Sequence, residues 1–513
     1  MMGRPYSRAC LSVPMSRRAF LAVLFVVLLS PSVRLHAETP ATKASAESEE
    51  SWQAIYFGKD RVGFAHVTAQ EVERNGKKVV VCDNLNQMTI NRFGVTLKMT
   101  VIQTSEEDLD GNMLGFKLSI DNPPNSKVES EGKIDGNKLT MTTLAAGRPK
   151  TTTADWDPTV KSPAYIDRAL QKEPLAPGQT RTFRMYDPQF SKVATITLTH
   201  AGREKTKLLD GTEKELDKIL TKHSLAFGLT ITSYIDASGE TVKTLTPLLP
   251  GMAVTTYAVT KEEALKEVSG GSLDIGMDTV IKTGPIKNAH KSTKAVYRLT
   301  IEGKAAEAIP AGPTQAVKSL SDTEIELTVK SIRPGTKGNE PQPGPQYLAS
   351  SRFLDLDDPN VKKLAEEGAA GKTDPVELAV ALENFVSRRL TDKNFSTALA
   401  TASEVARDLA GDCTEHSVLL AALLRENKIP SRVVIGFVYA DSLQGLGGHM
   451  WTEAYLNGGW VPLDATLGLG GIGVGHIKVA DADLSENSAA PVSAFVPIIH
   501  LLGKTKLELI SVE

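Results

Sequence analysis

The chain has 513 residues, which is too long for one hydrophobic core, so we expect two to four domains. Its apolar content of 41% and its charged content of 23% are ordinary for a soluble globular protein. The net charge is −3, and removing the five arginines of residues 1–37, which hold no acid, takes it to −8. Binding to phosphates needs a basic surface, so this balance argues against nucleic acid as a partner.

The N-terminus has the pattern of an export signal. In "MSRRAFLAVLFVVLLSPSVRLHA", paired arginines precede an apolar run, and a small residue, Ala37, follows. The run has about ten residues, whereas a bilayer span needs about 20. We therefore expect residues 1–37 to direct export to the periplasm or the medium, with no stable membrane span after signal removal. Both the twin-arginine and the ordinary secretion route fit, and an uncleaved membrane anchor is the alternative.

Residues 38–50 are small, polar and acidic, a composition that predicts a disordered linker. The range 51–270 has short β-rich runs, such as "VTLKMTVIQT" and "ATITLTH", separated by turn dipeptides. These dipeptides are Asn75-Gly76, Asp110-Gly111, Asp135-Gly136 and Asp210-Gly211. We expect an antiparallel, β-rich N-terminal domain here, and the sequence indicates no function for it.

A second β segment covers 271–346 and ends in a linker rich in proline and glycine. From 347 to 513 the pattern changes to helices followed by strands. In "TDPVELAVALENFVSRRL", Asp374 or Thr373 can cap a helix that has Pro375 at its first position. Helices followed by an antiparallel sheet predict an α+β domain.

One of the three cysteines opens a strongly apolar run, "LAGDCTEHSVLLAALL". Asp412, followed three residues later by Glu415, predicts a capping box, with Cys413 as the first residue of a buried helix. The helix dipole and the unpaired N–H groups at such a position favour a thiolate and can stabilise an oxyanion. A small apolar residue that merely begins a core helix is the alternative. A disulfide with Cys82 is disfavoured, because Cys82 lies in a strand pattern of the N-terminal domain.

A thiol nucleophile needs a base, and the base needs an orienting partner. In "GLGGHMWTEAYLNGGWVPLDATLG", His449 begins a strand, Asn457-Gly458 predicts a hairpin turn, and Asp464 ends the returning strand. Both side chains then lie at the same end of the hairpin, so a carboxylate can meet an imidazole. A lone histidine in a strand is usually structural, but the ordered set of cysteine, histidine and aspartate favours a site.

These segments together resemble the transglutaminase-like superfamily, whose core is papain-like, in its bacterial exported branch. The resemblance covers roughly 350–490 and depends on "GDC", "IPSR", "HMWTE" and "WVPLD". It implies Cys413 as nucleophile, His449 as general base and acid, and Asp464 as the residue that orients His449. Asn394 and Ser396 are candidate side-chain oxyanion donors. His416 is interpreted as a packing residue, and Trp451 as either a wall of the site or a core residue.

The predicted fold class is therefore α+β, with a papain-like transglutaminase core at 347–513 behind antiparallel β-rich domains. The predicted function is an exported cysteine acyl-transfer enzyme acting on peptide or protein carboxamides, as an amidase, a protease or a transglutaminase. A non-catalytic binding or scaffold protein at the cell surface is the alternative. We expect no cofactor, because no phosphate loop is present and no cysteine or histidine cluster indicates zinc. The oligomeric state stays open.

Overall fold

The computed structural model describes residues 49–92, 94–122, 126–145, 148–225, 229–249, 252–268, 274, 279–392, 400–485, 497–498 and 501–513. The predicted export signal lies outside these residues, as do Asn394, Ser396 and nearly all of the predicted linker at 38–50. None of the described helices is long and apolar enough to cross a membrane.

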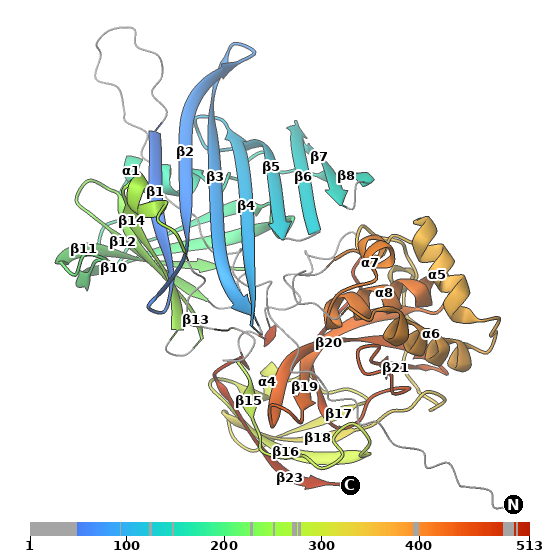
Figure 1. The fold of residues 1–513 in the computed structure, drawn as a ribbon. Coiled ribbons are helices and arrows are strands. Elements are labelled where there is room, and N and C mark those ends of the chain that lie inside the picture. Colours follow the sequence, from blue (N-terminus) through green and yellow to red (C-terminus); the bar gives the residue numbers. More distant parts are fainter. Residues whose placement is uncertain are drawn as a thin grey trace, which may run out of the picture.

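The N-terminal region is one antiparallel sheet of fourteen strands, in the order β8 to β1 and then β14 to β9 (Figure 1). Its first strands are β1 (Glu49–Phe57), β2 (Asp60–Arg74), β3 (Lys77–Arg92), β4 (Val95–Glu107), β5 (Met113–Asn122), β6 (Ser126–Asp135), β7 (Lys138–Ala145) and β8 (Arg148–Asp155). The others are β9 (Thr180–Asp187), β10 (Lys192–Lys207), β11 (Glu213–His223), β12 (Thr230–Ile235), β13 (Thr241–Leu249) and β14 (Met252–Val259). The pairing of β1 with β14 joins two meanders that are each built from consecutive strands. The predicted β-rich region is thus confirmed.

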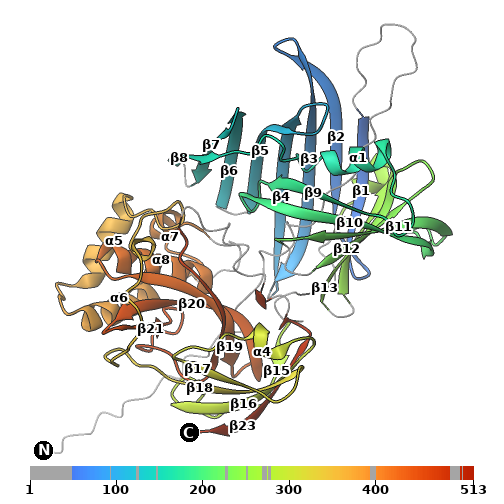
Figure 2. The same cartoon turned by 180° about the vertical axis from the view of Figure 1, so that it is seen from behind.

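The large sheet curls so that its two halves face each other, with β9 and β10 in front of β3 and β4 in the back view (Figure 2). Helix α1 (Tyr165–Lys172) lies in the connection between the two sheet edges, β8 and β9. Ile166 and Leu170 of this helix pack against buried side chains of β9–β11. Ala164, just before it, packs against Val67, Ala69 and Cys82 of β2 and β3. The connection therefore fills part of the concave face of the sheet.

A four-stranded sheet follows, in the order β17-β18-β16-β23. Its strands are β16 (Lys294–Ile301), β17 (Gln315–Ser319), β18 (Glu324–Lys330) and the C-terminal β23 (Thr505–Val512), with the short helix α4 (Ala305–Ala308) beside them. In the other direction, β15 (Ile281–Lys282) pairs with β20 (Gly445–Leu456) of the next sheet. Strand β15 lies before residue 346 but pairs with β20 of the later sheet, and β23 lies after residue 346 but pairs with β16 of the earlier sheet. We therefore propose that 271–346 and 347–513 fold as one unit, and that 51–270 forms a separate domain.

The C-terminal region combines helices on one side with an antiparallel sheet on the other, which confirms the α+β prediction (Figure 1). The helices are α5 (Pro359–Ala369), α6 (Pro375–Arg389), α7 (Ala402–Asp408) and α8 (Cys413–Glu426). The sheet has β20 at its centre, with β19 (Ser431–Ala440), β21 (Gly459–Leu463) and β22 (His476–Ala482). Helix α6 begins as predicted, with Asp374 as N-cap and Pro375 in the first turn. Helix α8 packs against both β19 and β20, so the core lies between helices and sheet.

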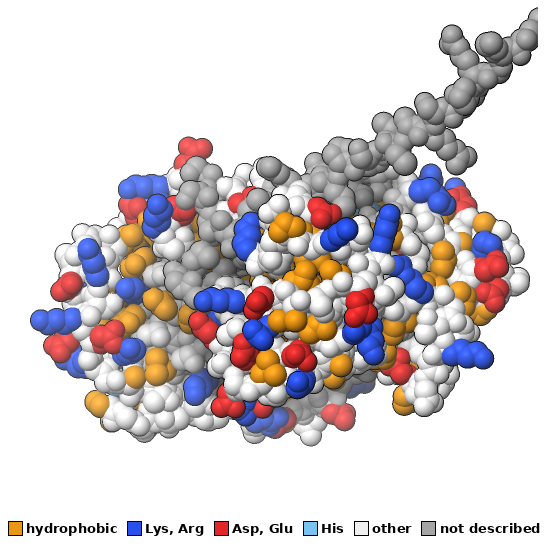
Figure 3. All heavy atoms as spheres, turned by 90° about the horizontal axis from the view of Figure 1, so that it is seen from below, with side chains coloured by type: hydrophobic (Ala, Val, Ile, Leu, Met, Phe, Trp, Pro, Cys, Tyr) orange, Lys and Arg blue, Asp and Glu red, His pale blue; other side chains and the backbone are white. Residues whose placement is uncertain are grey.

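The surface carries both signs of charge. On the face shown in Figure 3, lysine and arginine side chains are interspersed with aspartate and glutamate. Ion pairs among the described residues include Lys294 with Glu513 and Arg298 with Glu508.

Candidate active site

Cys413 begins α8, as the capping pattern predicts. Asp412 is the N-cap, and its Oδ1 accepts a hydrogen bond from the backbone N–H of Thr414 at 2.9 Å. Glu415 completes the capping box, because its Oε2 accepts from the backbone N–H of Asp412 at 2.9 Å. Nearly the whole helix is buried, and Cys413 itself is only 1% exposed. The thiol therefore lies at a helix N-terminus inside the protein, where the dipole favours its ionised form.

The glycine before this turn has a steric role. Gly411 has a φ of +138°, and a Cβ added to it would lie 2.3 Å from the side chain of Glu415. Glu415 is buried, and its Oε1 also accepts from the backbone N–H of Ala400 and from the hydroxyl of Thr414. Burial, followed by the charge of Asp412, raises the pKa of Glu415 to about 8. Gly411 thus leaves room for the buried carboxyl that holds the first turn of α8.

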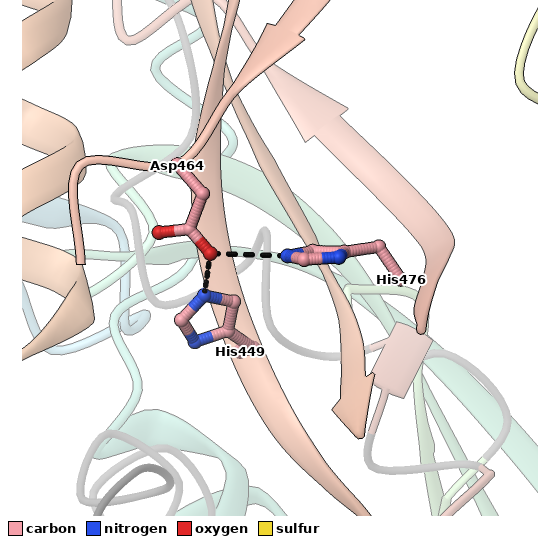
Figure 4. A group of neighbouring side chains, drawn as sticks. All are labelled: His449, Asp464 and His476. Carbon is pink, nitrogen blue, oxygen red and sulfur yellow. Dashed lines mark hydrogen bonds and ion pairs between the residues drawn. The ribbon is translucent and has the colours of Figure 1, made fainter. Parts of the chain in front are cut away.

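The hairpin of β20 and β21 brings His449 and Asp464 together. The turn between the strands is Asn457-Gly458, both with positive φ, and it pairs Leu456 with Gly459. His449 Nε2 lies 2.8 Å from Asp464 Oδ2, and Figure 4 shows the imidazole pointing at the carboxylate. Both residues are buried, so the bond is shielded from water. A bond through Nε2 turns Nδ1 to the opposite side of the ring.

The helix of Cys413 and the strand of His449 pack directly on each other. The hydroxyl of Thr452 on β20 donates to the carbonyl oxygen of Ser417 on α8 at 3.0 Å. Cys413 lies one helical turn before Ser417, and His449 lies three residues before Thr452. This bond therefore fixes helix α8 to strand β20.

A second histidine, His476, contacts the same carboxylate and was not predicted from the sequence. It is the first residue of β22, and its Nε2 lies 3.0 Å from Asp464 Oδ2 (Figure 4). Burial lowers the pKa of His476 to about 4, against the opposing effect of Asp464. At neutral pH it is therefore an uncharged imidazole that donates its Nε2 proton to Asp464. In the sequence, His476 directly follows the glycine-rich loop 468–475, which begins close to Asp464. This position is the signal from which His476 could have been identified.

A buried glutamate, Glu383 of α6, supports Asp464 from the other side, and it was also missed. Its Oε1 accepts from the backbone N–H groups of Asp464 at 2.9 Å and Gly471 at 3.2 Å. Burial is the main cause that raises its pKa to about 7, and the charge of Asp464 adds to it. A glutamate among Leu378, Leu382 and Val386, on the apolar side of the helix, was the available signal.

The charge of Asp464 is maintained although the residue is fully buried. Burial alone would raise its pKa, but His449, through its charge and its hydrogen bond, and His476 outweigh this effect and hold the pKa well below its ordinary value. The carboxylate is therefore ionised at neutral pH and can stabilise a protonated His449.

Trp451 packs against this group, whereas the contacts described for His416, Arg432 and Glu453 are with other residues. Trp451 is buried, with its ring stacked at 6.2 Å from that of His449 and edge-on to His476 at 5.2 Å, measured between centroids. His416 is fully buried, and its Nδ1 lies 2.6 Å from the carbonyl oxygen of Asp412, within its own helix. Arg432 and Glu453 pair at 2.7 Å on the neighbouring strands.

His449, Asp464 and His476 also form the type of ligand set that binds a divalent cation, with one atom from each within 4.8 Å of the others. Both Nε2 atoms are at hydrogen-bond distance from Asp464 Oδ2, however. The two Nε2 atoms thus share the carboxylate of Asp464 as their common acceptor.

Comparison with known protein families gives a match in the C-terminal region. Residues 362–465 match the model of the transglutaminase-like superfamily core. A comparison with curated proteins gave no match. Similar solved structures include a proposed cysteine protease from Cytophaga hutchinsonii, with 16% identity, 42% of this chain and 83% of that chain covered, and a TM-score of 0.28. The periplasmic domain of TgpA from Pseudomonas aeruginosa, bound to ethylmercury, has 18% identity, coverage of 37% and 75%, and a TM-score of 0.23.

A beta-barrel-like protein from Brucella abortus, of a domain family of unknown function, has 10% identity, coverage of 41% and 96%, and a TM-score of 0.30. Scores this low carry no argument about activity, and the family match is the informative result. Residues 362–465, which hold Cys413, His449 and Asp464, match the transglutaminase-like superfamily.

Proposed function

We propose that the protein is an exported cysteine enzyme that transfers acyl groups from peptide or protein carboxamides, with Cys413 as nucleophile, His449 as base and acid, and Asp464 as the orienting carboxylate. The observation that carries the proposal is the 2.8 Å contact of His449 Nε2 with the buried Asp464 Oδ2, on the strand that packs against the helix of Cys413. Because Nε2 is occupied by Asp464, the proposal gives Nδ1 of His449 the role of exchanging a proton with the thiol. The periplasm or the medium is the proposed location.

The chemistry follows in two steps. The Cys413 thiolate attacks the carboxamide carbon, and the backbone N–H at the start of α8 stabilises the oxyanion. His449, protonated at Nδ1, gives that proton to the departing amine as the C–N bond breaks, which leaves a thioester on Cys413. Water or a second amine then attacks the thioester and gives a proton back to His449. The C–S bond breaks, and the Cys413 thiolate is released together with a carboxylic acid or a new amide.

The burial of Cys413 and His449 affects how a substrate can reach them. Cys413 is 1% exposed and His449 2%, so a peptide reaches the sulfur only when neighbouring parts of the chain move. Movement of that kind would exclude bulk water while the thioester is formed. We propose hydrolysis as the main outcome, since the sequence contains no recognisable site for an acceptor amine.

The test is to incubate the full chain with glutamine-containing peptides and a labelled primary amine. Release of ammonia or cleaved peptide without amine incorporation supports hydrolysis, and incorporation of the amine identifies a transglutaminase. Both activities must disappear in Cys413→Ala. If the wild-type protein binds the peptides and turns over none of them, the non-catalytic binding protein is the better description.

A further inference from the structure

The concave face of the N-terminal sheet contains a hollow that is remote in sequence from the cysteine site. Its empty volume is about 920 Å³, part of it open to solvent, and its lining comes from β3 and β4 on one side and from β9 to β13 on the other. Residues beside and within α1 complete the lining. The curl of the sheet, visible in Figures 1 and 2, creates this hollow.

Three polar atoms at this hollow are buried and lack a hydrogen-bond partner among the described residues: Asn86 Oδ1, Gln189 Oε1 and His223 Nε2. Asn86 is 8% exposed and His223 9%, so neither is solvated like a surface side chain. A buried polar atom without a partner is unfavourable, because it has lost its hydration and gained no hydrogen bond in return. Three such atoms in one hollow favour a bound molecule that supplies the missing partners.

Two of these side chains, Asn86 and His223, are held in place by bonds on their other atoms. Asn86 Nδ2 donates to Asn84 Oδ1 at 2.8 Å. His223 Nδ1 accepts from the backbone N–H of Leu225 at 3.2 Å, which places the proton of the neutral ring on Nε2. That nitrogen lies 3.3 Å from Asp187 Oδ2, without the alignment of a hydrogen bond. The hollow therefore offers one fixed acceptor, Asn86 Oδ1, and one fixed donor, His223 Nε2, together with a second acceptor, Gln189 Oε1.

The lining also restricts the charge and shape of a ligand. Asp167 and Asp187 line the hollow, and none of its described lining residues is lysine or arginine, so anionic groups are disfavoured. Apolar side chains, among them Met185 and Ile196, alternate with the polar ones. A hydroxyl group both donates and accepts, and a sugar ring combines hydroxyls with apolar C–H faces. We propose that this hollow binds a neutral saccharide of one or two rings.

The experiment is ligand-detected NMR and calorimetry on the full chain, with maltose, cellobiose and diacetylchitobiose as neutral probes. Glucuronic acid serves as the anionic probe and Ala-Ala amide as the peptide probe. We expect at least one neutral disaccharide to bind, and Asn86→Leu and His223→Leu each to weaken its binding about tenfold or more. Gln87→Leu, on the same strand as Asn86 but outside the lining, is the matched control and leaves binding unchanged. Thermal melting establishes that each variant is folded.

Cys413→Ala must bind the sugar like the wild-type chain, which separates this result from the outcome for the proposed acyl transfer. The proposal is overturned if none of the neutral probes binds in the millimolar range. It is equally overturned if Gln87→Leu weakens binding as much as Asn86→Leu does. Preferred binding of Ala-Ala amide or of glucuronic acid would assign the hollow to a different ligand class.

Discussion

His476 and His449 approach the same oxygen atom of Asp464, at 3.0 Å and 2.8 Å. A carboxylate that accepts from two imidazoles has little freedom to rotate, so the orientation of His449 depends on His476 as well as on Asp464. His449 and Asp464 of the proposed triad therefore belong to a buried network of four groups with His476 and Glu383, in which Glu383 fixes the backbone of Asp464.

The first prediction concerns His476 as a positioning residue. His476→Leu removes one of the two donors to Asp464 Oδ2, and we expect kcat to fall about 10- to 100-fold with little change in KM. His476→Gln keeps an N–H donor and recovers part of the loss. Steady-state kinetics on a peptide amide would check this. Equal losses in both variants would mean that the effect is general disruption of the core.

The second prediction concerns the charge of Asp464. Asp464→Asn keeps the shape but removes the charge that stabilises protonated His449, so we expect kcat to fall about 10³- to 10⁴-fold. The exposed Asp357, which pairs with Lys362 at the surface, supplies the matched control. Asp357→Asn leaves the rate unchanged. A loss of less than tenfold in Asp464→Asn would show that the carboxylate charge is unimportant for the reaction.

The third prediction concerns pH and Glu383, whose pKa is raised to about 7 in the folded protein by burial. Between about pH 4.5 and 7 the folded state holds this proton and the unfolded state releases it, so the free energy of unfolding decreases as pH rises. The shift corresponds to about 3 kcal/mol across that window. The side chain of Glu383→Gln cannot titrate. The difference in unfolding free energy between this variant and the wild type should therefore change by about 3 kcal/mol between pH 4.5 and 7.

Urea unfolding of both proteins at several pH values measures this difference. If the two proteins keep a constant difference from pH 4.5 to 7, Glu383 is already ionised in the folded state and the prediction is wrong. Glu415, whose pKa is also raised, is present in both proteins and cancels in the comparison.

The fourth prediction concerns the ion pairs behind β20. Glu453 is nearly buried and contacts both Arg432 at 2.7 Å and Lys478 at 2.9 Å. Glu453→Leu leaves two cations without this partner, and we expect a loss of about 3–5 kcal/mol in the free energy of unfolding. Glu508→Leu, which breaks the exposed pair with Arg298, should cost less than about 1 kcal/mol. Urea titrations of the two variants compare these losses, and similar losses would contradict the prediction.

The parts of the fold that local chemistry determines were predictable. Asp412 and Glu415 identified the start of α8, because a capping box is set within four residues. Asn75-Gly76 and Asp210-Gly211 identified hairpins of the large sheet, because these dipeptides favour positive φ. The contact of His449 with Asp464 followed from the two-residue turn between their strands and from the alternation of side chains along them.

The parts that depend on distant packing were missed. His476 reaches Asp464 from another strand through a loop whose path the sequence does not determine, and Glu383 comes from a helix 81 residues before Asp464. The pairing of β1 with β14 joins segments about 200 residues apart, so the curl of the sheet and its hollow could not be inferred from local turns. The exchange of β15 and β23 between the two C-terminal sheets is non-local in the same way.

The most direct test of the account is the ionisation of Cys413, followed by the ultraviolet absorbance of its thiolate as a function of pH. The difference between the wild-type chain and Cys413→Ala isolates this thiol from Cys82, whose pKa burial raises to about 12. We predict a thiolate that persists well below pH 7 and is lost in His449→Ala. A thiol that titrates at the ordinary value of about 8.5 or above, and that is indifferent to His449, would contradict the proposed catalysis.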